Sequence, residues 1–134
     1  MINLRICLDV DNLERAIAFY TGAFELKVGR RFDQKWVELI GAQAPIDLLE
    51  TKEGSSPFTG ATALRTFERH WCPVHLDFVV ADLEKMLSTI LALGAKLERP
   101  VREEPYGRLA NLADPFGHGI CLLQMNERGY DALV

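Results

Sequence analysis

The sequence has no long apolar run and few cysteines, and both absences limit what the protein can be. No stretch approaches the roughly 18 apolar residues that a transmembrane helix needs. Arg5 and Asp9 interrupt the first ten residues, which therefore lack the apolar centre of a signal peptide. The three cysteines are an odd number without the spacing of a zinc site. Free thiols in a reducing compartment are the simplest interpretation, so we expect a cytoplasmic protein.

An excess of positive charge is also absent. The 134 residues include 15 Lys or Arg against 19 Asp or Glu, for a formal net charge of -4. Nucleic acids and anionic membranes attract concentrated basic surfaces, and the sequence has no basic cluster of that kind. We therefore expect neither nucleic acid nor a membrane as a partner. The length is sufficient to bury a core, and 49% hydrophobic with 25% charged residues is ordinary for a soluble protein.

The clearest pattern is an internal repeat with an offset of 70 residues. Residues 5–20 then align with residues 75–90, where three identities coincide with a shared hydrophobic periodicity. In each copy an alternating strand precedes a helix with apolar residues at i, i+3, i+4 and i+7. Asn12 and Asp82 stand just before the two helices, where a short polar side chain can cap free N–H groups. The apolar residues are Leu13, Ala16, Ile17 and Tyr20 in the first copy and Leu83, Met86, Leu87 and Ile90 in the second.

The repeat continues into strand pairs. Segments 36–40 and 46–50 in the first half resemble 109–113 and 120–124 in the second half. The turn DPFGHG joins the second pair, and its proline and glycines make it a strong turn prediction. Each half is therefore predicted to contain a strand, a helix, and two or three further strands.

A stretch with Gly, Ser and Pro separates the two halves. We expect a single domain over residues 1–134, made of a first module over about 1–55, a linker over about 51–70 and a second module over about 71–125. Within the linker, residues 63–70 are a candidate for a short helix.

Two βαβββ modules in tandem, with VDNLERAIAFY opening the first and RLANLADPFGHGICLLQ closing the second, resemble the vicinal oxygen chelate superfamily. That group includes glyoxalase I, extradiol dioxygenases, fosfomycin-inactivating transferases and bleomycin-binding proteins. The resemblance implies an α+β fold whose two modules form open, curved mixed sheets around a central cavity. It also implies that the first and last strands of each half present one ligand each to a divalent metal. One such fold hosts several unrelated activities, so the site must decide the function.

Strand periodicity predicts which side chains face that cavity. Leu76 and Phe78 are expected beneath the second helix. His75 and Asp77 alternate with them and are therefore expected on the cavity side. The same alternation directs Arg5 inward from the first strand. The four positions that match the family's metal ligands are Arg5, Asp47, His75 and Cys121.

Arg5 departs from the family pattern, because a guanidinium stays protonated and has no lone pair for a metal. Cys121 could bind a metal only as a thiolate, and it suits softer ions than the usual oxygen and nitrogen set. We therefore predict that Arg5 takes the place of the metal and pairs with the Asp47 carboxylate in a forked hydrogen-bonded contact. Plain interior packing is the alternative for the His75–Asp77 pair and for Cys121.

These residues predict a metal-free, small-molecule-binding protein of the glyoxalase and bleomycin resistance type. His75 is the candidate acid-base catalyst. The alternative is a metal-dependent lyase, isomerase or dioxygenase of the glyoxalase type, which would hold a divalent metal through Asp47 and His75. An interaction module with a filled interior is a third interpretation. The predicted ligand-binding residues are Arg5, Asp47, His75, Asp77 and Cys121.

We also expect a homodimer. Curved half-sheets leave strand edges and apolar flanks that a second copy can cover. The identity of the ligand, any reaction, and the pairing of modules within or across chains are left open by the sequence.

Overall fold

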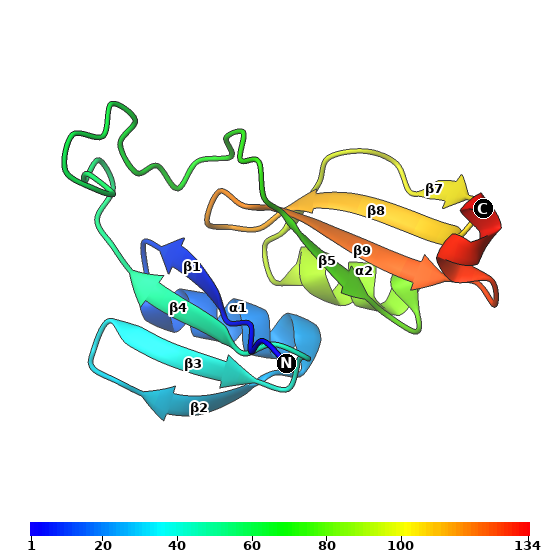
Figure 1. Cartoon of the computed structure of the whole chain (residues 1–134), viewed down its shortest axis with the longest axis horizontal. Coiled ribbons are helices and arrows are strands. Elements are labelled where there is room, and N and C mark those ends of the chain that lie inside the picture. Colours follow the sequence, from blue (N-terminus) through cyan, green and yellow to red (C-terminus); the bar gives the residue numbers. More distant parts are fainter. The chain divides into compact units, whose positions relative to one another are not determined.

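The computed structural model describes all residues 1–134 and divides them into two compact units, residues 1–67 and 68–134 (Figure 1). Each unit combines one α-helix with one mixed sheet and is described by itself. The α+β class and the open, mixed sheets expected from the sequence are confirmed.

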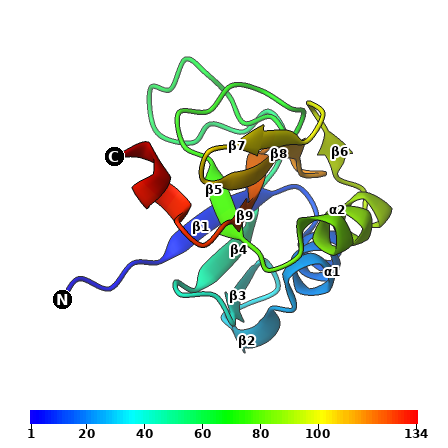
Figure 2. The ribbon, with the colours of Figure 1, turned by 90° about the vertical axis from the view of Figure 1, so that its right-hand side faces the viewer.

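The first unit has a four-stranded sheet in the order β1-β4-β3-β2. The outer strand β1 runs parallel to β4, and the other neighbours are antiparallel. Residues 1–5 precede the sheet as an extended segment, which Figure 2 shows running out from β1. Its elements are β1 (Ile6–Val10), α1 (Leu13–Phe24), β2 (Lys27–Arg31), β3 (Trp36–Ile40) and β4 (Ile46–Glu50).

The second unit repeats this arrangement with a five-stranded sheet. Its order is β5-β9-β8-β6, with β7 also paired to β8. The strand before the helix, β5, again runs parallel to the last strand, β9. Its elements are β5 (Leu76–Val79), α2 (Leu83–Ala92), β6 (Lys96–Leu97), β7 (Arg102–Glu104), β8 (Gly107–Ala113), β9 (Gly119–Met125) and a 3-10 helix (Gly129–Leu133).

Each helix buries its apolar side against one face of its own sheet. In the first unit all four predicted residues of α1 are buried, and in the second unit Leu83, Leu87 and Ile90 are buried while Met86 is half-buried. Strand residues of the matching parity complete the two cores. This arrangement leaves the opposite face of each sheet for polar side chains. The buried strand residues include Val37, Leu39, Ile46 and Leu48 in the first unit and Ala110, Leu112, Ile120 and Leu122 in the second.

At the start of each helix, two side chains accept backbone N–H groups: one from the N-cap residue and one from the end of a strand. The side chains of Asn12 and Asp82 accept a first-turn N–H at 2.9 and 3.0 Å, so the predicted caps are confirmed. At the ends of β4 and β9, Glu50 and Gln124 accept the N–H of the first residue of α1 and α2 at 2.8 and 2.7 Å. These hydrogen bonds connect the last long strand of each unit to the first residue of its helix, and they fix where the helix begins relative to the sheet.

The prediction of a short helix over residues 63–70 is wrong, because the segment contains only bends and irregular backbone. The Arg65 N–H donates to the Ser55 carbonyl at 2.9 Å, and the Arg65 carbonyl accepts from the Gly54 N–H at 2.8 Å. Backbone groups committed to a segment ten residues away cannot also form the i to i−4 bonds of a helix. No helix of the structure combines the length and the apolar character that crossing a lipid bilayer requires.

Candidate functional site

The helix-free face of the first sheet carries two buried carboxylates. Asp47 on β4 lies opposite Cys7 on β1 and opposite Glu38 on β3. Glu38 and Asp47 are each only 5% exposed. A buried carboxylate is costly unless it is paired, so cations are expected beside both.

Two arginines supply those cations. Arg5 makes the predicted forked contact with Asp47, from Nε to Oδ2 at 3.0 Å and from Nη2 to Oδ1 at 2.6 Å. The same Nη2 also donates to Glu38 Oε2 at 2.8 Å. Arg30 also binds Glu38, donating from Nε to Oε1 at 3.0 Å and from Nη2 to Oε2 at 2.7 Å. We call Arg5, Arg30, Glu38 and Asp47 the four-residue ionic cluster.

Sequence reasoning missed Glu38 and Arg30. Glu38 stands between the buried Val37 and Leu39, so alternation alone would have turned it toward the same face as Asp47. Arg30 gave no such signal, because the pairing of β2 with β3 shifts register between Val28 and Arg31. An irregularity of that kind changes which side chains face which way, and it is not readable from periodicity.

The ionic cluster has a clear electrostatic consequence. Hydrogen bonds from Arg30 and then Arg5 lower the pKa of Glu38 from 4.5 to about 2. Hydrogen bonds to Asp47 and then Glu38 raise the pKa of Arg5 well above its usual value. The cluster therefore holds two cations and two anions at neutral pH, and every charge has a partner within hydrogen-bond distance.

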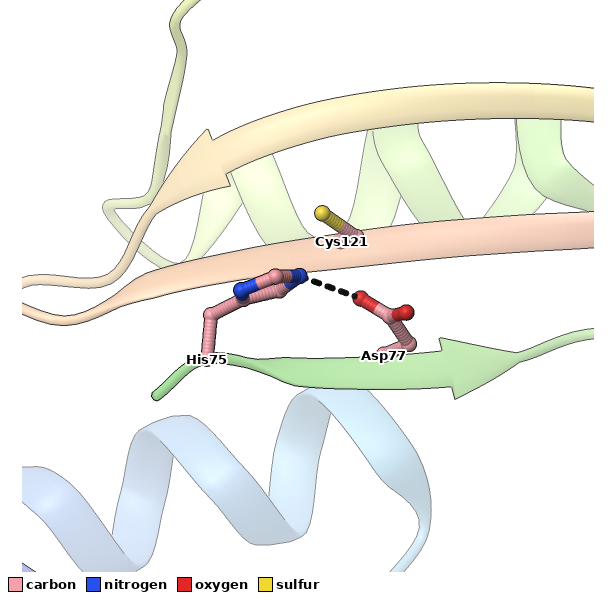
Figure 3. A group of neighbouring side chains, drawn as sticks. All are labelled: His75, Asp77 and Cys121. Atoms are coloured by element: carbon pink, nitrogen blue, oxygen red, sulfur yellow. Dashed lines mark ion pairs between the residues drawn. The ribbon is translucent and has the colours of Figure 1, made fainter. Parts of the chain in front are cut away.

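The second sheet carries a different group on its helix-free face. His75 just before β5, Asp77 on β5 and Cys121 on β9 point to the same side in Figure 3. His75 Nε2 lies 3.1 Å from Asp77 Oδ1. One ligand atom from each of the three residues lies within 4.8 Å of the others. The gathering follows from strand pairing, since Asp77 and Cys121 are direct partners in the parallel β5–β9 register.

A polar chain holds the Cys121 thiol in place. Asn111, which is paired with Cys121 across β8 and β9, donates from Nδ2 to Sγ at 3.1 Å. Arg102 in turn donates to the Asn111 side-chain oxygen at 2.9 Å. Burial first, and then the negative charge of Asp77, raises the pKa of Cys121 from 9.0 to about 11. Cys121 is accordingly a neutral thiol at physiological pH.

The predicted site residues thus form two groups. Arg5 contacts Asp47 in the first unit, and His75, Asp77 and Cys121 gather in the second unit. A ligand-binding role for all five residues, in a single cavity, stays a prediction. Beside the second group lies a cavity of about 180 Å³, and its lining includes His75, Asn111 and Cys121.

Comparison with known proteins identifies the family of this chain. Residues 5–123 match the glyoxalase-like domain family. The chain therefore belongs to this family, within the vicinal oxygen chelate superfamily. No curated protein sequence matches it.

Solved structures share this fold at low sequence identity. The fosfomycin resistance protein FosX from Listeria monocytogenes is 21% identical with a TM-score of 0.71, covering 96% of this chain and 98% of its own. A glyoxalase/bleomycin resistance protein/dioxygenase family enzyme from Burkholderia phytofirmans PsJN is 16% identical with a TM-score of 0.69, over 91% and 97%. Lactoylglutathione lyase from Agrobacterium tumefaciens is 18% identical with a TM-score of 0.62, over 92% of each chain.

The divalent metal of this superfamily does not fit the four matching positions of the chain. Arg5 offers no lone pair, and both oxygens of Asp47 accept hydrogen bonds from it. Cys121 could bind an ion only as a thiolate, and burial and Asp77 raise its pKa to about 11. Within the second unit, His75, Asp77 and Cys121 form a nitrogen, oxygen and sulfur set, which suits zinc better than a hard, oxygen-preferring ion.

Proposed function

We propose that this chain is a small-molecule-binding protein of the glyoxalase and bleomycin resistance type that works without the family's metal. In this proposal Arg5 occupies the place of the ion, and its fixed guanidinium supplies the positive charge there. His75 with Asp77 supplies a titratable pair in the second unit. The ligand-binding residues are Arg5, Asp47, His75, Asp77 and Cys121.

The forked contact between Arg5 and Asp47 is the observation that carries this proposal. Two parallel N–H to oxygen contacts, at 3.0 and 2.6 Å, fix the guanidinium plane as a single contact would not. Glu38 adds a third contact at 2.8 Å. A cation held by two buried carboxylates repels a divalent ion and leaves it few free oxygen ligands. A mutant of FosX from Listeria monocytogenes, which has the same fold, was crystallised in complex with Mn(II) and 1S,2S-dihydroxypropylphosphonic acid, so a related scaffold accommodates a small organic anion.

The decisive experiment replaces the guanidinium by a metal ligand. Arg5→His removes the fixed cation, frees Asp47, and places an imidazole at the family position. We expect the wild-type protein to contain no stoichiometric divalent metal, and Arg5→His to gain binding of Mn²⁺ or Zn²⁺ in calorimetric titration. Arg30→His is the matched control, because Arg30 also contacts Glu38 but lies on β2, away from the family position. It should gain no comparable binding.

A second candidate function is favoured by the gathering of His75, Asp77 and Cys121. This candidate is a metal-dependent lyase, isomerase or dioxygenase of the glyoxalase type, with these residues in place of the Asp47 and His75 pair suggested by the sequence. It predicts one bound ion per chain in protein purified without added metal. His75→Ala and Cys121→Ser should then each reduce metal content, and that result would replace the metal-free proposal.

A homodimer and a cytoplasmic location complete the proposal. Strands β1 and β2 are the edges of the first sheet, and the apolar residues Met1, Ile2 and Leu4 before β1 are exposed. Exposed apolar residues beside a strand edge favour association with a second copy. Light scattering should give twice the 15.1 kDa mass of the chain. Three free cysteines, two of them exposed, are consistent with a reducing compartment.

A further inference from the structure

The cavity of the second unit has a wall that the proposed function leaves unexplained. Its volume of about 180 Å³ is below the range of roughly 300–1,000 Å³ that is usual for drug-sized ligands. It equals the share of about six water molecules in the liquid. It therefore suits a small metabolite or one end of a larger one. Its polar lining includes Arg69, Cys72, His75, Glu98, Arg99 and Asn111.

Arg69 is held in the wall with part of its guanidinium unused. Its Nε donates to Glu98 Oε1 at 2.6 Å, and its Nη1 donates to the His70 carbonyl. Nη2 makes no hydrogen bond with the protein. Gly119 makes room for this group, because a Cβ there would lie only 2.5 Å from Nη2. The bare backbone at the start of β9 thus lets a cation lie directly on the strand.

Arg99 brings a second cation, and it is exposed and has no ion pair in the structure. His75 contributes a ring whose Nε2 is already paired with Asp77, which leaves Nδ1 unpaired. Two acceptors of the wall already have partners, since Glu98 Oε1 receives the Arg69 Nε–H and the Asn111 side-chain oxygen receives Arg102. The unused donors of the wall are Arg69 Nη2 and the Arg99 guanidinium, and two such cationic donors suit a ligand that brings its own acceptor oxygens.

We infer that this cavity binds the oxyanion group of a small ligand, a carboxylate or a phosphate, between the guanidinium groups of Arg69 and Arg99. Planar guanidinium groups hydrogen-bond such oxyanions in a fixed geometry, and the neighbouring His75 would then face the body of the ligand. The inference rests on the proposed small-molecule function. It adds the chemical class of the ligand and places its anionic end in the second unit.

The test is to titrate the full-length protein with inorganic phosphate and, separately, with sodium acetate. Binding is measured by calorimetry and by the shifts of amide NMR signals. At least one probe should bind to the wild-type protein and shift the Gly119 amide, and the preferred probe identifies the kind of oxyanion. Arg99→Gln should weaken that binding about tenfold through loss of a charge-assisted contact. Lys85→Gln, at an exposed position of α2 outside the lining, is the matched control and should bind like wild type.

Two further variants test the geometry without depending on Arg99. Gly119→Ala should weaken binding, because the new methyl group displaces the Arg69 head. Glu98→Gln should strengthen binding, since it removes the carboxylate that neutralises Arg69. A general loss of folding would weaken binding in both variants, so it cannot explain weaker binding in Gly119→Ala together with stronger binding in Glu98→Gln.

The outcomes separate this inference from the proposed function. If neither probe binds, or if Arg99→Gln and Gly119→Ala bind like wild type, the inference is wrong, while the metal experiment with Arg5→His still decides the proposed function. If binding is lost in Arg5→Gln but kept in Arg99→Gln, the oxyanion belongs to the first unit. That result overturns this inference and supports a ligand role for Arg5.

Discussion

The reactivity of the Cys121 thiol tests how the second unit is packed around it, because its surroundings favour the protonated thiol. Its pKa is raised from 9.0 to about 11, first by burial and then by Asp77. The thiolate is the reactive form. Because the pKa is raised by about two units, the thiolate fraction of Cys121 at pH 8 is about 100-fold smaller than that of an ordinary cysteine. In a variant with Cys7 and Cys72 changed to Ala, alkylation of Cys121 by iodoacetamide should be slower than that of free cysteine by at least this factor. The rate should rise about tenfold per pH unit toward pH 11.

Asp77→Asn in the same background separates the two causes of the raised pKa. It removes the negative charge but leaves the burial, so we expect the pKa of Cys121 to fall and alkylation at pH 8 to accelerate. Asp131→Asn removes an exposed carboxylate from the same unit and should leave the rate unchanged. Alkylation of Cys121 at pH 8 as fast as that of free cysteine would refute this reasoning. So would an identical rate with and without the Asp77 carboxylate.

Three other predictions concern the scaffold. The pKa of Glu38 is lowered to about 2, so its contribution to stability is complete above its usual pKa of 4.5 and is lost as the pH falls through about 2; Glu38→Gln should flatten the urea midpoint against pH in this window. Gln124→Ala removes the acceptor at the start of α2 and should cost about 1 kcal/mol in urea unfolding, with helicity by circular dichroism as the local readout. Gly107→Ala should cost roughly 3 kcal/mol or more, because φ is +141° and a Cβ would meet the Gln124 carbonyl at 2.0 Å; Gly60→Ala, with φ of +83° and open space, should cost less in the same assay.

Most of the fold could be predicted because its signals are local. The predicted strands over 36–40 and 46–50 coincide with β3 and β4, and both helices begin where Asn12 and Asp82 cap them. The strand β2 gave no signal, because all five of its residues are exposed and it pairs with a register shift. The 63–70 segment was mispredicted as a helix because the backbone of Arg65 bonds to Ser55 and Gly54, ten and eleven positions earlier, which no local propensity records.

In the candidate site too, the sequence predicted the contacts that depend on local patterns and missed those that depend on the folded arrangement. Alternation predicted that Arg5 and Asp47 face the same side, and the family resemblance implied that the two positions meet there; the contact itself is confirmed. The Glu38 contact also depended on the pairing of β3 with β4, which parity alone does not supply. Arg69 and Arg99 lie outside regular elements, so no periodicity could connect them. Their shared cavity is visible only once the chain has folded.

The two units carry different side chains at matching positions of the strand register. The strand before the helix, the last strand and its antiparallel neighbour bring three positions into line in each unit. In the first unit both carboxylates at these positions are buried and are paired with partly exposed arginines, so moving either carboxylate breaks an ion pair. In the second unit the imidazole of His75 is more than half exposed, and the nearby cavity keeps unused donors. The second unit therefore leaves an imidazole and unpaired guanidinium donors accessible, whereas the carboxylates of the first unit are held by their arginine partners. The register partners are Cys7, Asp47 and Glu38 in the first unit and Asp77, Cys121 and Asn111 in the second.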